Sequence, residues 1–298
     1  MKRNRRGDAR CFSQDIMRGE WQAGRQAGMI DKRVDVAGGL TCPGQAAQFD
    51  GYRVKEGTRS STETSGTSIF DPVLSELMCR WFCPLGGTIL DPFAGGSVRG
   101  IVASKLGYRY VGVELRAEQL VANTEQADRI CVDGDARPLW IEGDSLELGD
   151  LVGGATFDFV FSCPPYYDLE VYSDDPRDLS TMSWDQFSRA YSQIIKASVD
   201  LLLDNRFACF VVGDVRGKDG FYRGLPELTS EAFRAAGARK YNDAVLVTAA
   251  GSLPIRARGQ FEASRKLGKT HQNVMVFCKG DPRVAAKSVV SSRKAGRT

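Results

Sequence analysis

The chain of 298 residues carries 40 Lys and Arg against 37 Asp and Glu, and its net charge of +3 excludes a polycation. Its 42% apolar and 26% charged residues are ordinary for a soluble globular protein. No run approaches the roughly eighteen apolar residues that cross a bilayer, and no apolar segment follows the basic amino terminus, so we expect a cytoplasmic protein without membrane contact.

The eight cysteines are scattered along the chain, and there is a single histidine. Without a secretion signal, the cysteines are expected to be reduced thiols. The sequence contains no second cysteine pair to complete a zinc site with Cys79 and Cys83. We therefore expect no metal, and interpret the cysteines as small buried side chains.

Composition divides the chain into three predicted parts. Residues 1–65 are rich in Gly, Arg, Ser and Thr and are expected to be a loosely structured leader. Residues 66–280 are expected to form one folded domain. Residues 281–298 contain five Lys and Arg and, after Asp281, no acid, and we expect a basic flexible tail.

Strands and helices are predicted to alternate from residue 71 onward. Asp71 is expected to cap a helix that begins at Pro72, since proline suits the first helical position. The expected strands are 88–90, 108–113, 140–144, 157–162, 207–212, 244–249 and 273–278, and the later helices are 98–106, 117–128, 183–203 and 225–236. Repeated βα units predict an α/β, Rossmann-like fold: a mainly parallel sheet with helices on both faces. No helix is expected between the last two strands, which favours an antiparallel terminal pair.

Two apolar runs end abruptly in small, Gly or Pro residues. The first ends in Asp91-Pro92-Phe93-Ala94-Gly95-Gly96-Ser97, and the second in Ser162-Cys163-Pro164-Pro165-Tyr166-Tyr167. Both are typical of buried parallel strands that deliver a loop at their carboxyl end, where open α/β sheets bind ligands.

The first loop and the two following strand ends are suited to a nucleoside cofactor. Gly95 and Gly96 let the backbone approach a ligand closely. Glu114 closes the next strand and can accept hydrogen bonds from ribose hydroxyls, and Asp144 closes the third and can accept one from an adenine amino group. A Walker lysine and the complete G-x-G-x-x-G pattern are both missing.

These segments resemble the amino-methyltransferases of DNA, which form N6-methyladenine or N4-methylcytosine. Asp91-Pro92-Phe93-Ala94-Gly95 is similar to their S-adenosylmethionine motif, and Cys163-Pro164-Pro165-Tyr166 to their catalytic motif. The resemblance covers residues 67–279 and implies a class I methyltransferase fold with S-adenosyl-L-methionine as cofactor. It also implies that Phe70 and Phe93 join Asp91, Gly95, Gly96, Glu114 and Asp144 in the cofactor site.

The resemblance also implies how the second loop acts on double-stranded DNA whose target base is flipped out. The first side chain of the motif and the carbonyl of Pro164 would accept the two amino protons, Pro165 would stiffen the turn, and Tyr166 would stack on the base. The chain departs from the family at Cys163, because Asp, Asn or Ser is usual there and a thiol is a weak acceptor. Ser162, one residue earlier, is an alternative acceptor, and a thiolate role for Cys163 is a third reading. The cofactor loop departs as well, reading Gly95-Gly96-Ser97 where Gly-Ser-Gly is usual.

Target recognition is expected to fall to loops of this domain, and basic residues in two later regions, 216–223 and 256–269, are expected to contact the nucleic acid backbone. They are Arg216, Lys218, Arg223, Arg256, Arg258, Arg265, Lys266 and Lys269. The sole histidine, His271, is expected to make a structural hydrogen bond.

The leading hypothesis is a site-specific DNA methyltransferase, with or without a restriction partner. The alternatives are an RNA methyltransferase, for instance on guanine N2, and a catalytically silent nucleic-acid-binding module. The sequence indicates neither the target base nor the oligomeric state.

Overall fold

The computed structural model describes residues 69–248 and 253–295. The chain divides into a unit of Met1–Ile69 and a unit of Phe70–Thr298, and the described fold belongs to the second. The predicted leader, residues 1–65, lies outside the described residues.

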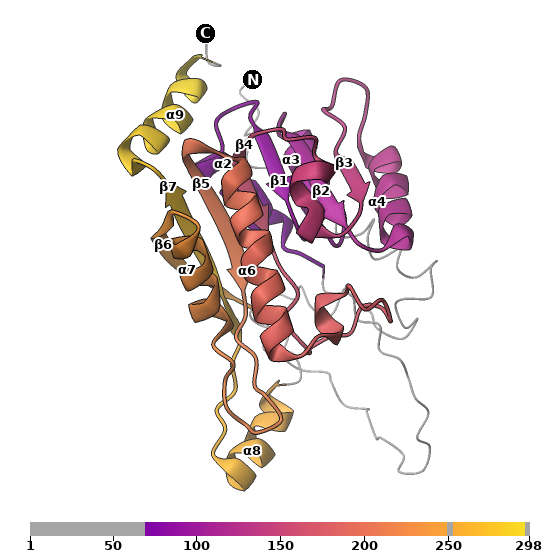
Figure 1. Ribbon diagram of the computed structural model, residues 1–298, viewed down its shortest axis with the longest axis vertical. Coiled ribbons are helices and arrows are strands. Elements are labelled where there is room, and N and C mark those ends of the chain that lie inside the picture. The colour runs from indigo at the N-terminus through magenta and orange to yellow at the C-terminus, as the bar shows by residue number, and fades with distance from the viewer. Residues whose placement is uncertain (1–68, 249–252, 296–298) are drawn as a thin grey trace, which may run out of the picture. The chain divides into compact units, whose positions relative to one another are not determined.

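Seven strands form one sheet in the order β3-β2-β1-β4-β5-β7-β6 (Figure 1). Every neighbouring pair from β3 to β5 is parallel, and β7 runs antiparallel to both β5 and β6. The strands are β1 (Thr88–Asp91), β2 (Arg109–Glu114), β3 (Leu139–Glu142), β4 (Phe157–Ser162), β5 (Leu202–Val212), β6 (Ala238–Val247) and β7 (His271–Lys279). The predicted parallel sheet with an antiparallel terminal pair is confirmed.

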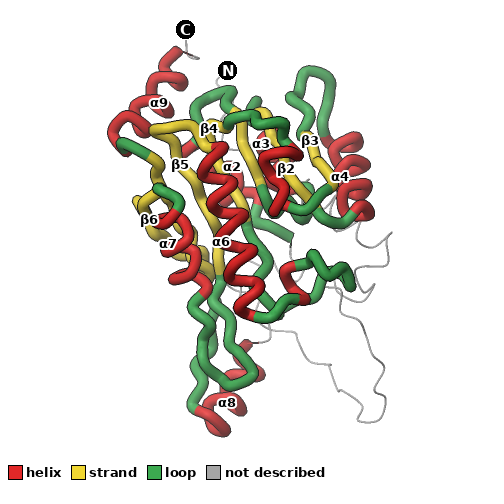
Figure 2. Tube along the Cα trace, in the orientation of Figure 1, coloured by secondary structure: helices red, strands yellow, loops and turns green. Residues whose placement is uncertain are grey.

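Helices cover both faces of this sheet. In Figure 2, α6 and α7 lie in front of the sheet, and α2 and α3 lie behind it. The α-helices are α2 (Pro72–Phe82), α3 (Val98–Lys105), α4 (Ala117–Ile130), α5 (Leu148–Leu151), α6 (Trp184–Leu201), α7 (Leu225–Ala235), α8 (Leu253–Ser264) and α9 (Pro282–Ala295), and the short 3-10 turns are η2 (Ser145–Glu147) and η3 (Leu179–Thr181). Within the described ranges, no helix combines the length and the apolar character that a bilayer crossing requires.

Local sequence sets the helix boundaries. Asp71 Oδ1 accepts hydrogen bonds from the backbone N–H groups of Val73 and Leu74, at 2.7 and 3.1 Å, which is the predicted cap of α2. Ser183 and Gln186 form a reciprocal capping box at the start of α6. These contacts satisfy N–H groups that the first turn of a helix leaves without intrahelical partners.

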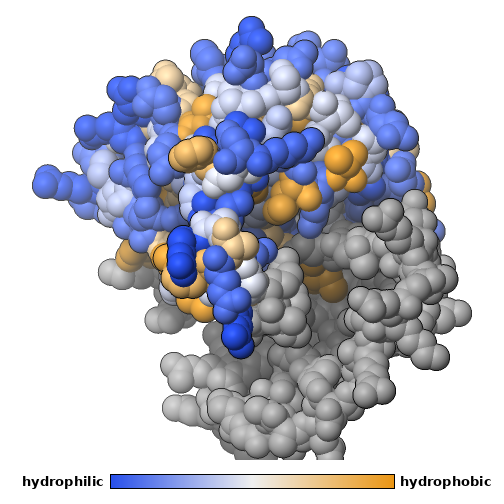
Figure 3. Space-filling model, turned by 90° about the horizontal axis from the view of Figure 1, so that it is seen from below, coloured by the Kyte–Doolittle hydropathy of each residue, from blue (hydrophilic) through white to orange (hydrophobic). Residues whose placement is uncertain are grey.

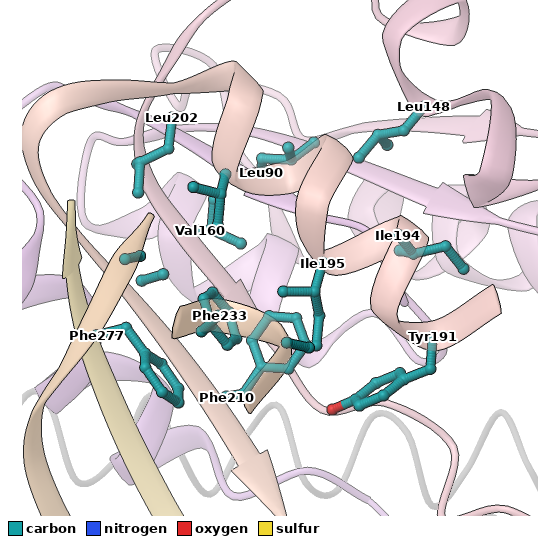
Figure 4. Close-up of a cluster of buried hydrophobic side chains, with 14 of the residues drawn as sticks. Leu90, Leu148, Val160, Tyr191, Ile194, Ile195, Leu202, Phe210, Phe233 and Phe277 are labelled. Carbon is teal, nitrogen blue, oxygen red and sulfur yellow. The ribbon is translucent and has the colours of Figure 1, made fainter. Parts of the chain in front are cut away.

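An aromatic and aliphatic core fills the space between the sheet and α6 and α7 (Figure 4). The rings of Phe233 on α7 and Phe277 on β7 stack with their centroids 3.9 Å apart, and Phe210 on β5 meets Phe233 edge-on at 4.9 Å. All three rings are fully buried. The close packing of these buried rings makes the sheet rigid, and with it the edge from which the two predicted loops leave.

The order in which successive strands are added to the sheet changes direction between the parallel strands β1 and β4. From β1 the sheet grows through β2 to β3 on one side and, after the crossover to β4, through β5 on the other. Leu90 pairs with Val160 at the centre of this junction. Such a switch point is where open α/β sheets bind ligands, at the carboxyl ends of the strands. The glycine turn and the Pro-Pro turn follow the two strands that flank it.

The carboxyl-terminal region differs from the sequence-based expectation in two places. Pro282–Ala295 forms α9, whereas a flexible tail is predicted from residue 281. Ala285 and Val289, one helical turn apart, are buried, so two small apolar residues suffice to dock a segment that otherwise reads as polar. A second helix, α8, interrupts the predicted basic loop between β6 and β7 and lies beyond the carboxyl edge of the sheet (Figure 1).

Candidate active site

Three hydrogen bonds join the loops at the carboxyl edge of the sheet. Ser162 donates to Asp91 Oδ1 at 2.5 Å, which ties the end of β4 to the end of β1. The backbone N–H of Gly95 donates to Glu114 Oε2 at 2.9 Å, and Ser145 donates to the carbonyl of Pro92 at 2.5 Å. The glycine turn therefore contacts the end of β2 and the 3-10 turn η2 after β3, and the bond between Ser162 and Asp91 brings the two predicted motifs side by side.

Asp91 is the hub of this arrangement and has no exposed surface. Its Oδ2 accepts from Arg99 Nε at 2.6 Å and from the Tyr110 hydroxyl at 2.8 Å, and its Oδ1 accepts from the N–H of Phe93 as well as from Ser162. Asp91 was expected to contact the cofactor, but its carboxylate is fully enclosed by protein donors. It acts by holding the glycine turn in place.

Arg99, on the first turns of α3, completes the buried ion pair. Its guanidinium is 5% exposed and also donates to the carbonyls of Phe93 and Ala94, at 2.8 and 2.9 Å. Its cationic carbon lies 4.7 Å from the centre of the Phe70 ring. Sequence reasoning missed Arg99, although a lone arginine in a helix of small and apolar residues is a usable signal of a buried partner.

The backbone conformation at position 95 requires a glycine. Its φ of +50° lies in the left-handed region, and apart from its chain neighbours no atom of the described residues comes within 4 Å of the position that a Cβ would occupy. Its carbonyl accepts from the Asn123 side chain on α4 at 2.7 Å. The turn is thus held by β2 and α4, while no described side chain fills the space beside Gly95.

Glu114, the predicted ribose acceptor, is largely buried at the end of β2. It accepts from Gly95 through Oε2 and from the N–H of Arg116 through Oε1, at 3.0 Å. Each carboxylate oxygen has two acceptor sites, so ligand hydroxyls can still donate to it. Burial raises the pKa of Glu114, against the hydrogen bonds from Arg116 and Gly95 and the charge of Arg116, which lower it.

The raised pKa of Glu114 predicts a pH-dependent stability. Folded Glu114 holds its proton to higher pH than the unfolded chain, so its contribution to the free energy of unfolding is largest below the ordinary pKa of 4.5 and is lost as pH rises through the folded value. In urea titrations across this window, Glu114→Gln should remove that part of the pH dependence. The matched variant Glu142→Gln, on the neighbouring strand end, should keep it. Equal profiles for the wild type and Glu114→Gln would contradict the assignment.

The remaining predicted cofactor residues fall into two groups. Asp144 is half-buried after β3, and its Oδ1 caps η2 by accepting from Leu146 at 2.9 Å. Phe93 packs inward against Tyr191 and Phe210, and Phe70 packs against Phe161. Phe93 therefore supports the turn, while Asp144 caps η2 and its contact with a cofactor stays a prediction.

The Pro-Pro turn is held by aromatic side chains. Tyr166 donates its hydroxyl proton to the carbonyl of Val211 at 3.3 Å, and its ring lies against Gly213, where a Cβ would come within 2.9 Å of Cε2. Tyr167 has a φ of +57°, rare for a tyrosine, and its ring packs edge-on against Trp184 and Phe187. Neither Tyr167 nor Gly213 was singled out from the sequence.

Cys163 and Ser162 have different environments. The Cys163 Sγ lies 3.4 Å from the Tyr166 hydroxyl, within hydrogen-bond distance, and either group can donate. Burial raises the pKa of Cys163, which keeps the thiol protonated and is unfavourable for a nucleophile. Ser162, considered as an alternative acceptor, is fully buried and committed to Asp91, so it does not face the loop.

The Pro164 carbonyl accepts no hydrogen bond from any described residue. Pro164 itself is buried, and Pro165, Tyr166 and Tyr167 beside it are half-buried. Since no described residue uses this acceptor, it is available to a ligand that donates an N–H.

The predicted basic residues are only partly brought together. Arg216 lies in the loop after β5, and Arg265 and Lys269 lie between α8 and β7, whereas Arg223 pairs with Asp219 and Arg258 with Glu262. Lys218 is exposed, Lys266 lies near Gly220, and the side chain of Arg256 is outside the described residues. Figure 3 shows the described surface at the α8 end as mainly hydrophilic, with separate hydrophobic spots.

His271 differs from the expectation. Its imidazole is exposed and makes no side-chain hydrogen bond with a described residue, whereas a structural hydrogen bond was predicted. It lies at the start of β7, among the residues of a cavity beside the loop after β5.

No family model matches the chain, and no curated protein matches it. The fold is similar to TrmN from Thermus thermophilus, with 15% identity over 70% of this chain and 49% of that one and a TM-score of 0.49. NSun6 from Pyrococcus horikoshii with SFG is 12% identical over 70% and 52% of the two chains, with a TM-score of 0.49. Magnesium protoporphyrin IX methyltransferase from Synechocystis PCC 6803 with bound SAM is 10% identical over 70% and 76%, with a TM-score of 0.44. The chain spans about half the length of the first two structures.

The strand order, the antiparallel β7 and the crossover at β1 and β4 define a class I methyltransferase fold of Rossmann-like type. The predicted fold class is thus confirmed, and the two motifs that carry the resemblance lie at its switch point.

Proposed function

We propose that the protein is an S-adenosylmethionine-dependent methyltransferase that acts on the exocyclic amine of a nucleic acid base, N4 of cytosine or N6 of adenine in DNA. One observation carries the proposal: the hydrogen bond between Ser162 and Asp91 fixes the Pro-Pro turn beside the glycine turn, at the switch point of the sheet. A base presented at the Pro-Pro turn would meet a methyl group held at the glycine turn.

The residues at the glycine turn fit the proposed cofactor. Glu114 retains acceptor sites for ribose hydroxyls, Asp144 is half-buried at the next strand end, and no described side chain fills the space beside Gly95. Once bound there, the cofactor would supply an electrophilic methyl group on a sulfonium centre. Asp91 and Arg99 would hold the turn rigid through their buried ion pair.

The second turn would orient the amine. An exocyclic amino nitrogen is a poor nucleophile because its lone pair is delocalised into the ring. The carbonyl of Pro164, which no described residue engages, would accept one amino proton and favour the geometry in which the lone pair is available. Cys163 is a weak acceptor for the second proton, and Tyr166, which is half-buried, would stack on the base.

Methyl transfer with labelled cofactor tests the proposal, using duplex DNA, single-stranded DNA and RNA as substrates. We expect label in DNA and, in a mass-spectrometric nucleoside digest, N4-methylcytosine or N6-methyladenine. Label only in RNA would replace DNA as the substrate, and 5-methylcytosine would indicate a thiolate at Cys163. Cofactor binding without transfer to any nucleic acid would leave a silent binding module.

A further inference from the structure

A cavity of about 420 Å³ lies beside the loop that follows β5. Three segments form it: the loop from β5 to α7, the end of the α8 excursion, and the first residue of β7. Its walls are Asp214, Arg216, Tyr222, Arg265, Leu267, Gly268, Lys269 and His271. Segments more than forty residues apart in sequence therefore converge on one site.

The cavity begins next to the Pro-Pro turn. Tyr166 lies against Gly213 and donates to the carbonyl of Val211, and the residue after Gly213 is Asp214 in the cavity wall. A nucleotide whose base reached Tyr166 would thus bring its neighbouring phosphates to this side of the sheet edge.

Cations without carboxylate partners dominate the cavity. Arg216, Arg265 and Lys269 form no ion pair with a described residue, whereas most other described arginines and lysines do, including Arg223 and Arg258 close by. The only acid in the wall is Asp214, whose Oδ1 accepts the N–H groups of Val215, Gly224 and Leu225. Its charge is engaged in shaping the loop, so the cavity keeps a positive balance.

Tyr222 holds two of these cations in place. The guanidinium carbon of Arg216 lies 3.9 Å from the centre of the Tyr222 ring, and Lys269 Nζ lies 5.8 Å from it. Arg216 also donates to the carbonyl of Gly220 at 3.0 Å, and residues 216 and 222 form a β-bridge. Cations positioned beforehand lose less side-chain entropy when they bind an anion.

We propose that this cavity holds a backbone phosphate of the polynucleotide strand that carries the target base. Guanidinium and ammonium groups recognise phosphate oxygens with charge-assisted hydrogen bonds, and the exposed His271 imidazole can add a further donor. The cavity is larger than one phosphate group and leaves room for the attached sugar. The placement next to the target base rests on the proposed function, but phosphate binding itself does not.

The test is the salt dependence of binding to fluorescent oligonucleotides, measured by anisotropy for single and double strands of DNA and of RNA. The double variant Arg265→Gln/Lys269→Gln should bind about tenfold more weakly at low salt. The slope of log K against log salt should become shallower by about 0.7 on single strands or 0.9 on duplexes for the lost phosphate contact. Comparison of the affinities for DNA and for RNA oligonucleotides identifies which nucleic acid supplies the phosphate.

The matched control is Arg109→Gln/Arg283→Gln, which removes two exposed cations at the start of β2 and on α9. It should leave affinity and slope unchanged, and thermal melting should show both variants folded. If the cavity variant binds like the wild type, or loses no more than the control, the proposal is overturned. If the cavity variant loses binding while the wild type transfers no methyl group, the phosphate site is upheld and only the proposed function is rejected. If the cavity variant binds normally while the wild type transfers a methyl group, the proposed function stands and the phosphate site is rejected.

Discussion

Asp91→Ala should lower the free energy of unfolding by about 3–5 kcal/mol, the cost of leaving a buried charge without its partner. Asp91 is fully buried and its Oδ2 lies 2.6 Å from Arg99 Nε, in a side chain only 5% exposed. Removing the carboxylate also strips the Tyr110 and Ser162 hydroxyls of their acceptor. Urea unfolding monitored by tryptophan fluorescence measures the change.

The control for this result is an ion pair with the same separation but at the surface. Asp128 and Arg137 lie 2.6 Å apart with more than half of each side chain exposed, so Asp128→Ala should change stability by no more than about 1 kcal/mol. If Asp91→Ala does not fold, the milder Asp91→Asn keeps the side-chain volume and should still destabilise the protein clearly. Equal losses for Asp91 and Asp128 variants would show that the buried pair is not what holds the two turns.

The sheet and the position of the two motifs could be predicted because the signals are local. Apolar runs such as Phe157–Ser162 end abruptly at Cys163, and parallel strands must deliver their loops at one edge. The partners of Asp91 could not be predicted in this way. Arg99, Tyr110 and Ser162 lie 8, 19 and 71 residues away, and only the three-dimensional packing shows that they share one carboxylate. For the same reason the sequence predicts a ligand contact for Asp91, whereas in the structure its carboxylate supports the glycine turn.

The carboxyl-terminal helices show a second limit of sequence reasoning. The segment before β7 is basic and lacks an apolar stripe, so α8 gives no periodic signal, and its charges predict a solvated loop equally well. In α9 the apolar residues are few, and of those whose side chains are described Ala285 and Val289 are the buried ones. Consequently, the sequence predicts the same backbone contact for all eight basic residues. In the structure Arg216, Arg265 and Lys269 line one cavity, whereas Arg258 pairs with Glu262.

Tyr166→Ala should reduce kcat/KM for the nucleic acid by about 10- to 100-fold, since stacking on a base is worth about 1–3 kcal/mol. Its effect on cofactor affinity should be small, because Tyr166 contacts Gly213 and Val211 on the β5 side and not the glycine turn. Steady-state kinetics with varied oligonucleotide, together with calorimetric cofactor binding, separate the two quantities. Equal losses in turnover and in cofactor affinity would contradict the stacking role.

Tyr166→Phe is the matched variant, because it keeps the ring and removes only the hydroxyl that reaches Val211 and Cys163, at 3.3 and 3.4 Å. A loss of only a few-fold in kcat/KM is expected if the face of the ring stacks on the base.

Cys163→Ser tests the first residue of the motif. A hydroxyl accepts hydrogen bonds better than a thiol, so methyl-transfer activity should be kept or raised. An inactive serine variant would require a thiolate despite the raised pKa of Cys163. Together the variants distinguish a turn that positions an amine from one that attacks a ring carbon.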